Sequence, residues 1–150
     1  KLKVPHQVLE YQHDPTAESY GLEAAAKLDL AAPQVFKTLV AALDGKELVT
    51  AIVPVDQLLN MKQLAKAAGA KKAAMAAAAD VERSSGYVLG GVSPLGQKKL
   101  LRTFIDDSAA GFETIYVSAG KRGLEIGLKP ADLQACLKAK LVSLCQLENH

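Results

Sequence analysis

The sequence predicts an α+β fold in which short strands and hairpins dominate the middle of the chain. Two apolar segments, 35–43 and 47–55, meet at Asp44-Gly45 and have the pattern of a β-hairpin. Further short strands, separated by turns that contain Gly, follow in the second half of the chain. Strand and helix patterns do not alternate regularly, so a parallel βαβ sheet is disfavoured.

The composition is that of one globular domain, residues 1–150. Hydrophobic residues make up 49% and charged residues 23% of the 150 residues, which excludes a disordered chain and provides for one complete core. Aromatic residues reach only 5%, so Val, Leu, Ile and Ala must fill that core.

The first half of the chain is expected to contain an edge strand, a helix and the hairpin. Alternation over residues 8–13 indicates a strand that Pro15 ends. The segment 20–30 is rich in helix formers and has Ser19 as its candidate cap. Both hairpin segments are apolar on both faces, so we expect them at the centre of a sheet.

Helices and short strands are expected after the hairpin. Asn60 and Gln63 have the spacing of a capping box, and Gly69 is placed to end the helix that they open. A further short helix is expected over 80–84. Three short strands are then expected over 102–106, 114–118 and 124–128.

The last expected element is a long helix that Pro130 starts and that extends to Cys145. This helix would place Cys136 and Cys145 on opposite faces, roughly 13 Å apart along its axis. A disulfide between them is therefore not expected. We expect both to fill the core, away from any catalytic pocket.

Charge and motif content exclude several functional classes. The formal net charge is only +2, so a nucleic-acid contact must be local, and DNA is not an expected partner. No apolar run is long enough to span a membrane and no signal peptide is evident, which indicates a cytoplasmic protein. The 3 His residues lack zinc-site spacing, and neither a metal nor a cofactor is expected.

Lys37 is the first of three candidate functional features. Alternation places it on the same apolar face as Val35 and Leu39, where a lysine is costly unless it is paired or lines a cavity. Such a lysine could have a lowered pKa, or could stay charged and hold an oxyanion or a phosphate. The alternative, which spacing alone favours, is a lysine near a strand end whose amine reaches solvent.

Two loops are the other candidates. In GGVSPLG, Gly90 to Gly96, the paired glycines would let backbone amides approach an anion, although the spacing is not that of a P-loop. A β-bulge with a tight turn explains this loop equally well. In SAGKRGLEI, Ser118 to Ile126, a strand that carries Glu125 follows a Gly turn and could form one wall of a cleft. Composition favours an ordinary hairpin with a solvated basic tip.

Five segments together resemble the bacterial YbaK-type Cys-tRNA(Pro) deacylases, which are similar to the editing domain inserted in bacterial prolyl-tRNA synthetases. The segments are EYQHDP (10–15), VFKTL (35–39), GAKKAAMA (69–76), SSGYVLGGVSPLGQKK (84–99) and TIYVSAGKRGLEI (114–126). The resemblance implies a mixed, mostly antiparallel, barrel-like β-sheet flanked by helices. It also implies one editing domain that lacks the family's first N-terminal helix and that hydrolyses the ester of mischarged aminoacyl-tRNA.

The resemblance further implies the residues of the site. Lys37 matches the family's essential lysine and is the expected catalytic residue. The expected substrate-binding residues are Tyr11, Ser19, Thr38, Gly90, Gly91, Ser93, Pro94, Gly96, Ser118, Gly120 and Glu125. Two of them depart from the family pattern, because Ser19 stands where an Asn is common and Glu125 where an Asp is common.

The reaction implied by the resemblance needs no nucleophile from the protein. The thiolate of the substrate cysteine attacks its own ester carbonyl, while Lys37 and the loop amides stabilise the oxyanion. The implied partners are the aminoacylated 3′ end of tRNA and, since basic clusters are modest, a prolyl-tRNA synthetase. The alternatives are a deacylase of Ala-tRNA(Pro) or of another small amino acid, and a non-catalytic tRNA- or synthetase-binding module, against which Lys37 argues.

Overall fold

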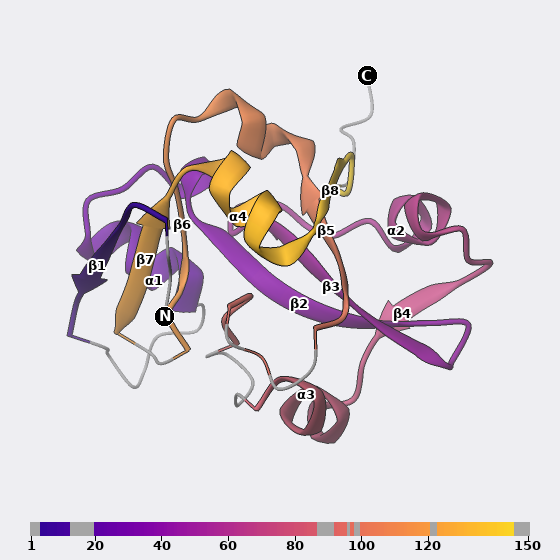
Figure 1. Cartoon of the computed structure of the whole chain (residues 1–150). Helices are drawn as coiled ribbons and strands as arrows, with labels where there is room; N and C mark the ends of the chain where they lie inside the picture. The colour runs from indigo at the N-terminus through magenta and orange to yellow at the C-terminus, as the bar shows by residue number, and fades with distance from the viewer. Residues whose placement is uncertain are drawn as a thin grey trace.

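The structure is a computed structural model that describes residues 4–12, 20–86, 92–95, 97, 100–120 and 123–145. Within these ranges the chain forms two β-sheets with helices around them, which confirms the predicted α+β class (Figure 1). The smaller sheet lies on one side of the molecule, and helix α2 and strand β4 lie on the other (Figure 1).

The larger sheet has five strands in the order β4-β2-β3-β5-β8. Its strands are β2 (Phe36–Leu43), β3 (Glu47–Pro54), β4 (Ala73–Met75), β5 (Arg102–Asp106) and β8 (Lys140–Val142). Strands β2 and β3 form the predicted antiparallel hairpin and lie inside the sheet, as predicted. Asp44 and Gly45 have φ values of 53° and 69°, the left-handed backbone that suits a tight hairpin turn. The β3–β5 and β5–β8 pairs are parallel, so the sheet is mixed.

The smaller sheet has the order β1-β7-β6 and is antiparallel throughout. Its strands are β1 (His6–Glu10), β6 (Ile115–Ser118) and β7 (Leu124–Leu128), with β1 at the edge, as predicted. A bridge between Val35 and Tyr116 joins the two sheets. In the described residues the sheets do not close into a barrel, so the barrel-like expectation is corrected to two open sheets in contact.

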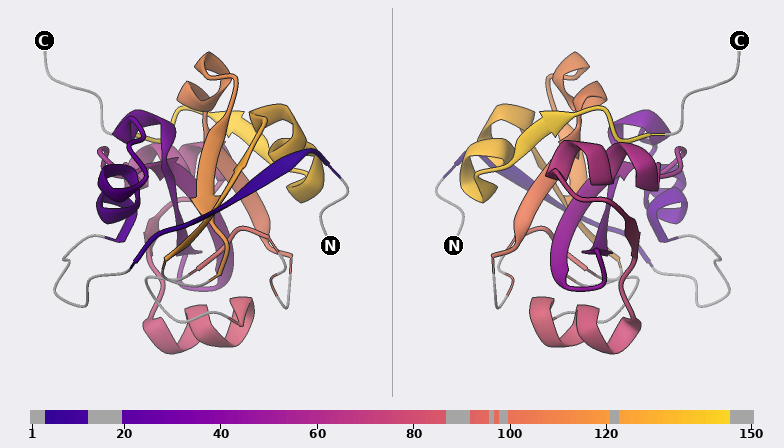
Figure 2. Two further views of the ribbon diagram at one scale, coloured as in Figure 1. Left: turned by 90° about the vertical axis from the view of Figure 1, so that its left-hand side faces the viewer. Right: turned by 90° about the vertical axis from the view of Figure 1, so that its right-hand side faces the viewer.

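In the described part of the chain, four helices and two 3-10 turns flank the sheets (Figure 2). They are α1 (Tyr20–Lys27), α2 (Met61–Ala68), α3 (Ala78–Ser85), α4 (Pro130–Leu137), Ala32–Gln34 and Asp107–Gly111. Helix α3 lies at one end of the molecule, and the 3-10 turn of residues 107–111 lies at the other (Figure 2). No helix in the described part of the chain is long and apolar enough to cross a membrane.

Helix α2 begins with only half of the predicted capping box. The Asn60 carboxamide oxygen accepts hydrogen bonds from the backbone N–H groups of Lys62 at 3.0 Å and Gln63 at 3.1 Å, as predicted. The Asn60 N–H, however, donates to the carbonyl oxygen of Leu144 at 2.7 Å. Gln63 instead contacts Ser143 at 3.1 Å. The start of α2 is therefore tied to the C-terminal segment.

The predicted long C-terminal helix is wrong. Helix α4 ends at Leu137, since Lys138 adopts a left-handed backbone with φ 53°, and β8 follows. Pairing of β8 with the edge of β5 outweighs the helical pattern of this segment. Cys136 is consequently exposed, which contradicts its expected place in the core. Cys145 lies beyond β8, half-buried against the apolar cluster of the larger sheet.

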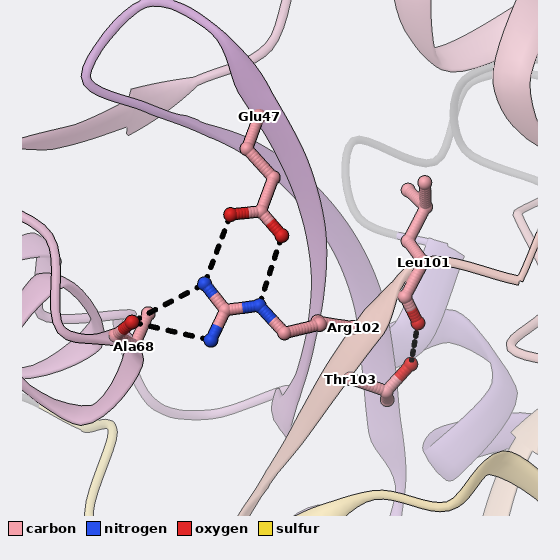
Figure 3. A network of polar contacts seen from close by, with 5 residues as sticks. All are labelled: Glu47, Ala68, Leu101, Arg102 and Thr103. Atoms are coloured by element: carbon pink, nitrogen blue, oxygen red, sulfur yellow. Dashed lines mark hydrogen bonds and ion pairs between the residues drawn. The ribbon is translucent and has the colours of Figure 1, made fainter.

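Arg102 connects three elements next to this cluster (Figure 3). Its guanidinium makes two 2.9 Å hydrogen bonds to the Glu47 carboxylate and two at 3.2 Å to the carbonyl oxygen of Ala68, at the end of α2. The ring of Phe104 lies 5.7 Å below it. Arg102 thus holds β5, β3 and α2 together, and its charge is already paired with Glu47.

Candidate active site

Lys37 lies on β2 directly opposite Val53 of β3, whose side chain is fully buried. Alternation places it on the face that carries Leu39 and Ala41, which belong to the apolar cluster covered by α2. Lys37 is half-buried there. Burial lowers its pKa from the ordinary 10.5, while the neighbouring Cys145 and Asp56 act in the opposite direction.

Thr38 points to the other face of β2. It is buried opposite Ile52, and its hydroxyl has no hydrogen-bond partner among the described residues. The same holds for Thr50 on β3. Both lie on the face that packs against the segment containing Val92 and Leu101. The structure therefore separates Thr38 from Lys37, although the two are adjacent in the sequence.

The described part of the GGVSPLG loop also lies on the Thr38 side. Val92 packs against Val40 of β2, two residues after Thr38. Ser93 and Pro94 are buried, and the Ser93 hydroxyl accepts a hydrogen bond from the Leu95 N–H at 3.2 Å. Gly90, Gly91, Gly96 and Ser19 lie outside the described residues.

The smaller sheet brings a second group of expected residues to one face. Ser118 of β6 is directly opposite Glu125 of β7, which in turn is opposite Leu9 of β1. Tyr11, two residues beyond Leu9, donates its N–H to the carbonyl oxygen of Gly123 at 2.9 Å. The Ser118 hydroxyl accepts the N–H of Gly120 at 3.1 Å and so closes the turn after β6.

The bridge between the sheets relates this group to Lys37. Val35 and Tyr116 are directly opposite in a parallel bridge, and Lys37 and Ser118 each lie two residues further along. Because residues two apart in a strand share a face, Lys37 and Ser118 both point to the side of the bridged pair. Lys37 therefore lies on the same side of the junction as Ser118, while Ser118, Glu125 and Tyr11 share one face of the smaller sheet.

Glu125 is the most perturbed carboxyl of this face. It is only 6% exposed, and burial raises its pKa to about 7. Burial also raises the pKa of Tyr11, and the charges of Glu125 and Glu23 add to that rise. Glu23 on α1 is buried and forms an ion pair with Lys27 at 3.2 Å. The carboxyl of Glu125, the phenol of Tyr11 and the hydroxyl of Ser118 therefore lie on one weakly solvated face of the smaller sheet.

Sequence reasoning missed Asp56 and Cys145, whose charges act on Lys37, and Asp106, which holds the segment that contains Cys145. Asp56 lies two residues after the end of β3, Asp106 ends β5, and Cys145 comes from the segment after β8. An Asp at or just after the end of an apolar strand could have pointed to the first two, because functional side chains are often found there. Cys145 gave no such signal, since the segment was expected to be helical. The described residues hold no group of three or more His, Cys, Asp or Glu side chains placed to bind a metal.

Comparison with known proteins identifies the family. Residues 14–136 match the model of the aminoacyl-tRNA editing domain. Over 135 residues the chain is 40% identical to the "Putative Cys-tRNA(Pro)/Cys-tRNA(Cys) deacylase EbsC" of Enterococcus faecalis, covering 85% of this chain and 77% of that protein. It is 24% identical over 125 residues to the uncharacterized protein YwhH of Bacillus subtilis, covering 83% of this chain and 79% of YwhH.

Solved structures show the same fold. The crystal structure of a "putative trans-editing enzyme for prolyl tRNA synthetase" matches with a TM-score of 0.83 at 20% identity, covering 95% of this chain and 87% of that one. Hypothetical protein APE2540 matches with a TM-score of 0.84 at 22% identity, covering 95% and 92% of the two chains. Together with the family match over most of its length, this shows that the chain belongs to the aminoacyl-tRNA editing domain family.

Proposed function

We propose that the chain is a trans-editing hydrolase that removes cysteine from mischarged Cys-tRNA(Pro). The observation that carries the proposal is a half-buried lysine, Lys37, on an apolar sheet face in a member of the editing family. The 40% identity to the Enterococcus faecalis deacylase supports cysteine as the amino acid. The proposal includes action as a single editing domain in the cytoplasm, where tRNA is charged.

The proposed chemistry uses the thiol of the substrate as nucleophile. Its thiolate attacks the ester carbonyl, a carbon–sulfur bond forms, and the carbon–oxygen bond to the tRNA ribose breaks. The ribose oxygen leaves and takes up a proton, and the cyclic thioester of cysteine is later opened by water. Lys37 donates a hydrogen bond to the oxyanion that forms on the carbonyl oxygen. A weakly solvated face strengthens that interaction.

The remaining expected residues would hold the substrate. We propose that Tyr11, Ser118, Gly120 and Glu125 contact the aminoacyl-adenosine end from the smaller sheet. Thr38, Ser93 and Pro94 are buried on the other face of β2, and we propose that they shape the site from behind this strand, while Ser19, Gly90, Gly91 and Gly96 complete the surroundings of the adenosine end. We further propose that a prolyl-tRNA synthetase on the same tRNA supplies specificity, in line with the name of one structural neighbour. The paired charge of Arg102 supports this, because it leaves fewer cations for tRNA.

Substrate choice tests the proposal. We expect fast deacylation of Cys-tRNA(Pro), and little deacylation of Ala-tRNA(Pro) or Pro-tRNA(Pro), in an assay with radiolabelled amino acids. Cys-tRNA(Cys) belongs in the same assay, because the name of the relative includes it. Preference for the Ala ester would favour the sister activity, and no turnover of any ester would favour a non-catalytic binding module.

The thiol mechanism makes a separate prediction. Charging the same tRNA with Ser, which lacks the thiol, should reduce turnover by about a hundredfold or more because the nucleophile is lost. Replacing both protein cysteines, Cys136→Ser with Cys145→Ser, should leave turnover of the Cys ester nearly intact. Burial raises the pKa of Cys145 to about 12, so its thiolate is scarce at neutral pH. Fast hydrolysis of the Ser ester, or an inactive double variant, would contradict the mechanism.

A further inference from the structure

Asp106, the last residue of β5, is a buried carboxylate that faces the C-terminal segment. It is only 4% exposed. Its Oδ1 accepts the backbone N–H groups of Leu144 at 2.9 Å and Cys145 at 3.3 Å, and its Oδ2 accepts the N–H of Ser108 at 3.2 Å. Three backbone donors thus compensate the cost of burying this charge, at a point where two chain segments meet.

Residues 143–145 are also held from the opposite side. The carbonyl oxygen of Leu144 accepts the Asn60 N–H at 2.7 Å, and Cys145 forms an antiparallel bridge with Leu59. The Leu144 side chain is fully buried in the cluster that contains Leu64 and Phe104. The segment therefore lies between the end of β5 and the start of α2, with Asp106 as its anchor on the β5 side.

This anchored segment reaches the surroundings of Lys37. Cys145 packs against the apolar cluster to which Leu39 also contributes, two residues along β2 from Lys37. Cys145 and Asp56 are the two titratable groups whose charges act on Lys37. The Cys145 N–H donates to the Asp106 carboxylate, and burial together with the charge of Asp106 raises the pKa of the Cys145 thiol. Asp106 thus holds Cys145, which packs against the apolar cluster beside Lys37.

We propose that Asp106 is a positioning residue for the deacylation: its carboxylate fixes residues 143–145 against the Lys37 face and thereby closes one side of the site. Asp106 does not touch the substrate and acts through the segment that it holds. The inference rests on the proposed function only in taking Lys37 as the group that acts on the ester. The placement of the segment can be tested without any substrate.

The position of Asp106 beside Cys145 also affects which thiol attacks the ester. An ionised thiol beside Lys37 could itself attack the bound ester, which would form a thioester on Cys145 and release the tRNA. Cleavage would then stall on a covalent intermediate that water opens slowly. Burial and the charge of the nearby Asp106 carboxylate disfavour the thiolate and keep the proton on sulfur. Asp106 thus leaves the substrate thiol as the nucleophile.

The test compares the isosteric variant Asp106→Asn with Asp107→Asn, an exposed neighbour, as control. In Asp106→Asn we expect iodoacetamide to alkylate Cys145 about tenfold faster at pH 8. The negative carboxylate that raises the pKa of Cys145 is then absent, so a larger fraction of the thiol is ionised. The exposed Cys136 should react at an unchanged rate and serves as an internal control. Mass spectrometry of the digested protein reads both rates.

A second readout follows Lys37 directly. In protein labelled with ¹³C-lysine, the Lys37 resonance is assigned through Lys37→Arg and titrated with pH. Burial is the main cause that lowers the pKa of Lys37, so we expect loosening of the segment to admit water and to raise this pKa toward 10.5. The kcat for Cys-tRNA(Pro) should fall about tenfold, which a displaced oxyanion donor would cause. Asp107→Asn should change none of these quantities.

The outcomes separate this inference from the proposed function. Unchanged alkylation of Cys145 and unchanged titration of Lys37 in a folded Asp106→Asn variant would overturn the positioning role, whatever the deacylase activity. Both changes together, without deacylation even by the unmodified protein, would support the anchoring and overturn the proposed function. If Asp106→Asn does not fold, amide hydrogen exchange of the unmodified chain tests whether residues 143–145 are anchored. Protected amides at Leu144 and Cys145 support the anchor, and fast exchange there overturns it.

Discussion

Replacing Lys37 with Ala is expected to slow deacylation of Cys-tRNA(Pro) by about a hundredfold to a thousandfold, the usual cost of removing one oxyanion donor. The side chain lies on an apolar face opposite the fully buried Val53. Removing a half-buried amine from such a face relieves desolvation, so the free energy of unfolding should change little. Single-turnover deacylation and thermal unfolding followed by circular dichroism measure the two effects.

Lys46→Ala is the matched control, because Lys46 is an exposed lysine in the turn between β2 and β3. It should leave deacylation unchanged. If the Lys37→Ala variant keeps activity within about threefold of the unmodified protein, Lys37 is not the oxyanion donor. If instead the variant unfolds, the lysine has a structural role that the apolar surroundings do not suggest.

Elements defined by local signals were predictable from the sequence. The hairpin followed from two apolar segments around Asp44-Gly45, and both residues have the left-handed backbone that such a turn requires. Asn60 and Gly69 marked the two ends of α2, and each adopts its capping conformation. In these cases the signal and the structure lie within a few residues of each other, so no knowledge of distant contacts is needed.

Elements defined by distant partners were not predictable. Strands β4 and β8 have three residues each, and their pairing with β2 and β5 fixes them. The Leu- and Lys-rich segment around β8 has helical composition, so propensity indicated a helix there, and no element was predicted for the Ala-rich segment around β4. Helix α4 ends at Leu137, so Cys145 is not part of a helix. It lies instead close enough to Lys37 for its charge to affect the pKa of that lysine.

The candidate site also has features that local sequence patterns predict and features that depend on distant partners. Alternation along β2 correctly placed Lys37 on an apolar face. The resemblance suggested one pocket for Lys37 and Thr38, yet the pleat of the strand turns Thr38 to the opposite face. Asp106 is brought to the segment of Leu144 and Cys145 by the order of strands in the larger sheet, which depends on the parallel pairs of β3 with β5 and of β5 with β8. No single segment of sequence carries that order.

Glu125 gives the second large effect, a pH dependence of stability. The folded protein raises the pKa of Glu125 from 4.5 to about 7 by burial, so folding favours the protonated form. Below about pH 4.5 the carboxyl is protonated in both states and its full contribution is present. As the pH rises to 7 and above, the unfolded chain gains from ionisation, and about 3 kcal/mol of stability is lost.

The variant Glu125→Gln removes this titration while keeping the size of the side chain. Its free energy of unfolding, measured by urea denaturation, should exceed that of the unmodified protein by up to about 3 kcal/mol at pH 8, and by much less at pH 5. Glu113→Gln, at an exposed site, is the control and should show no such difference. Equal stability of Glu125→Gln and the unmodified protein at both pH values would contradict this prediction. It would mean that a counter-charge at this face offsets the free-energy cost of ionising the buried Glu125 carboxyl. A stability gain confined to pH 8 would instead show that no counter-charge offsets the ionised carboxyl of Glu125, which lies beside Tyr11 and Ser118. Once ionised, this carboxylate would attract the cationic ammonium of the aminoacyl group.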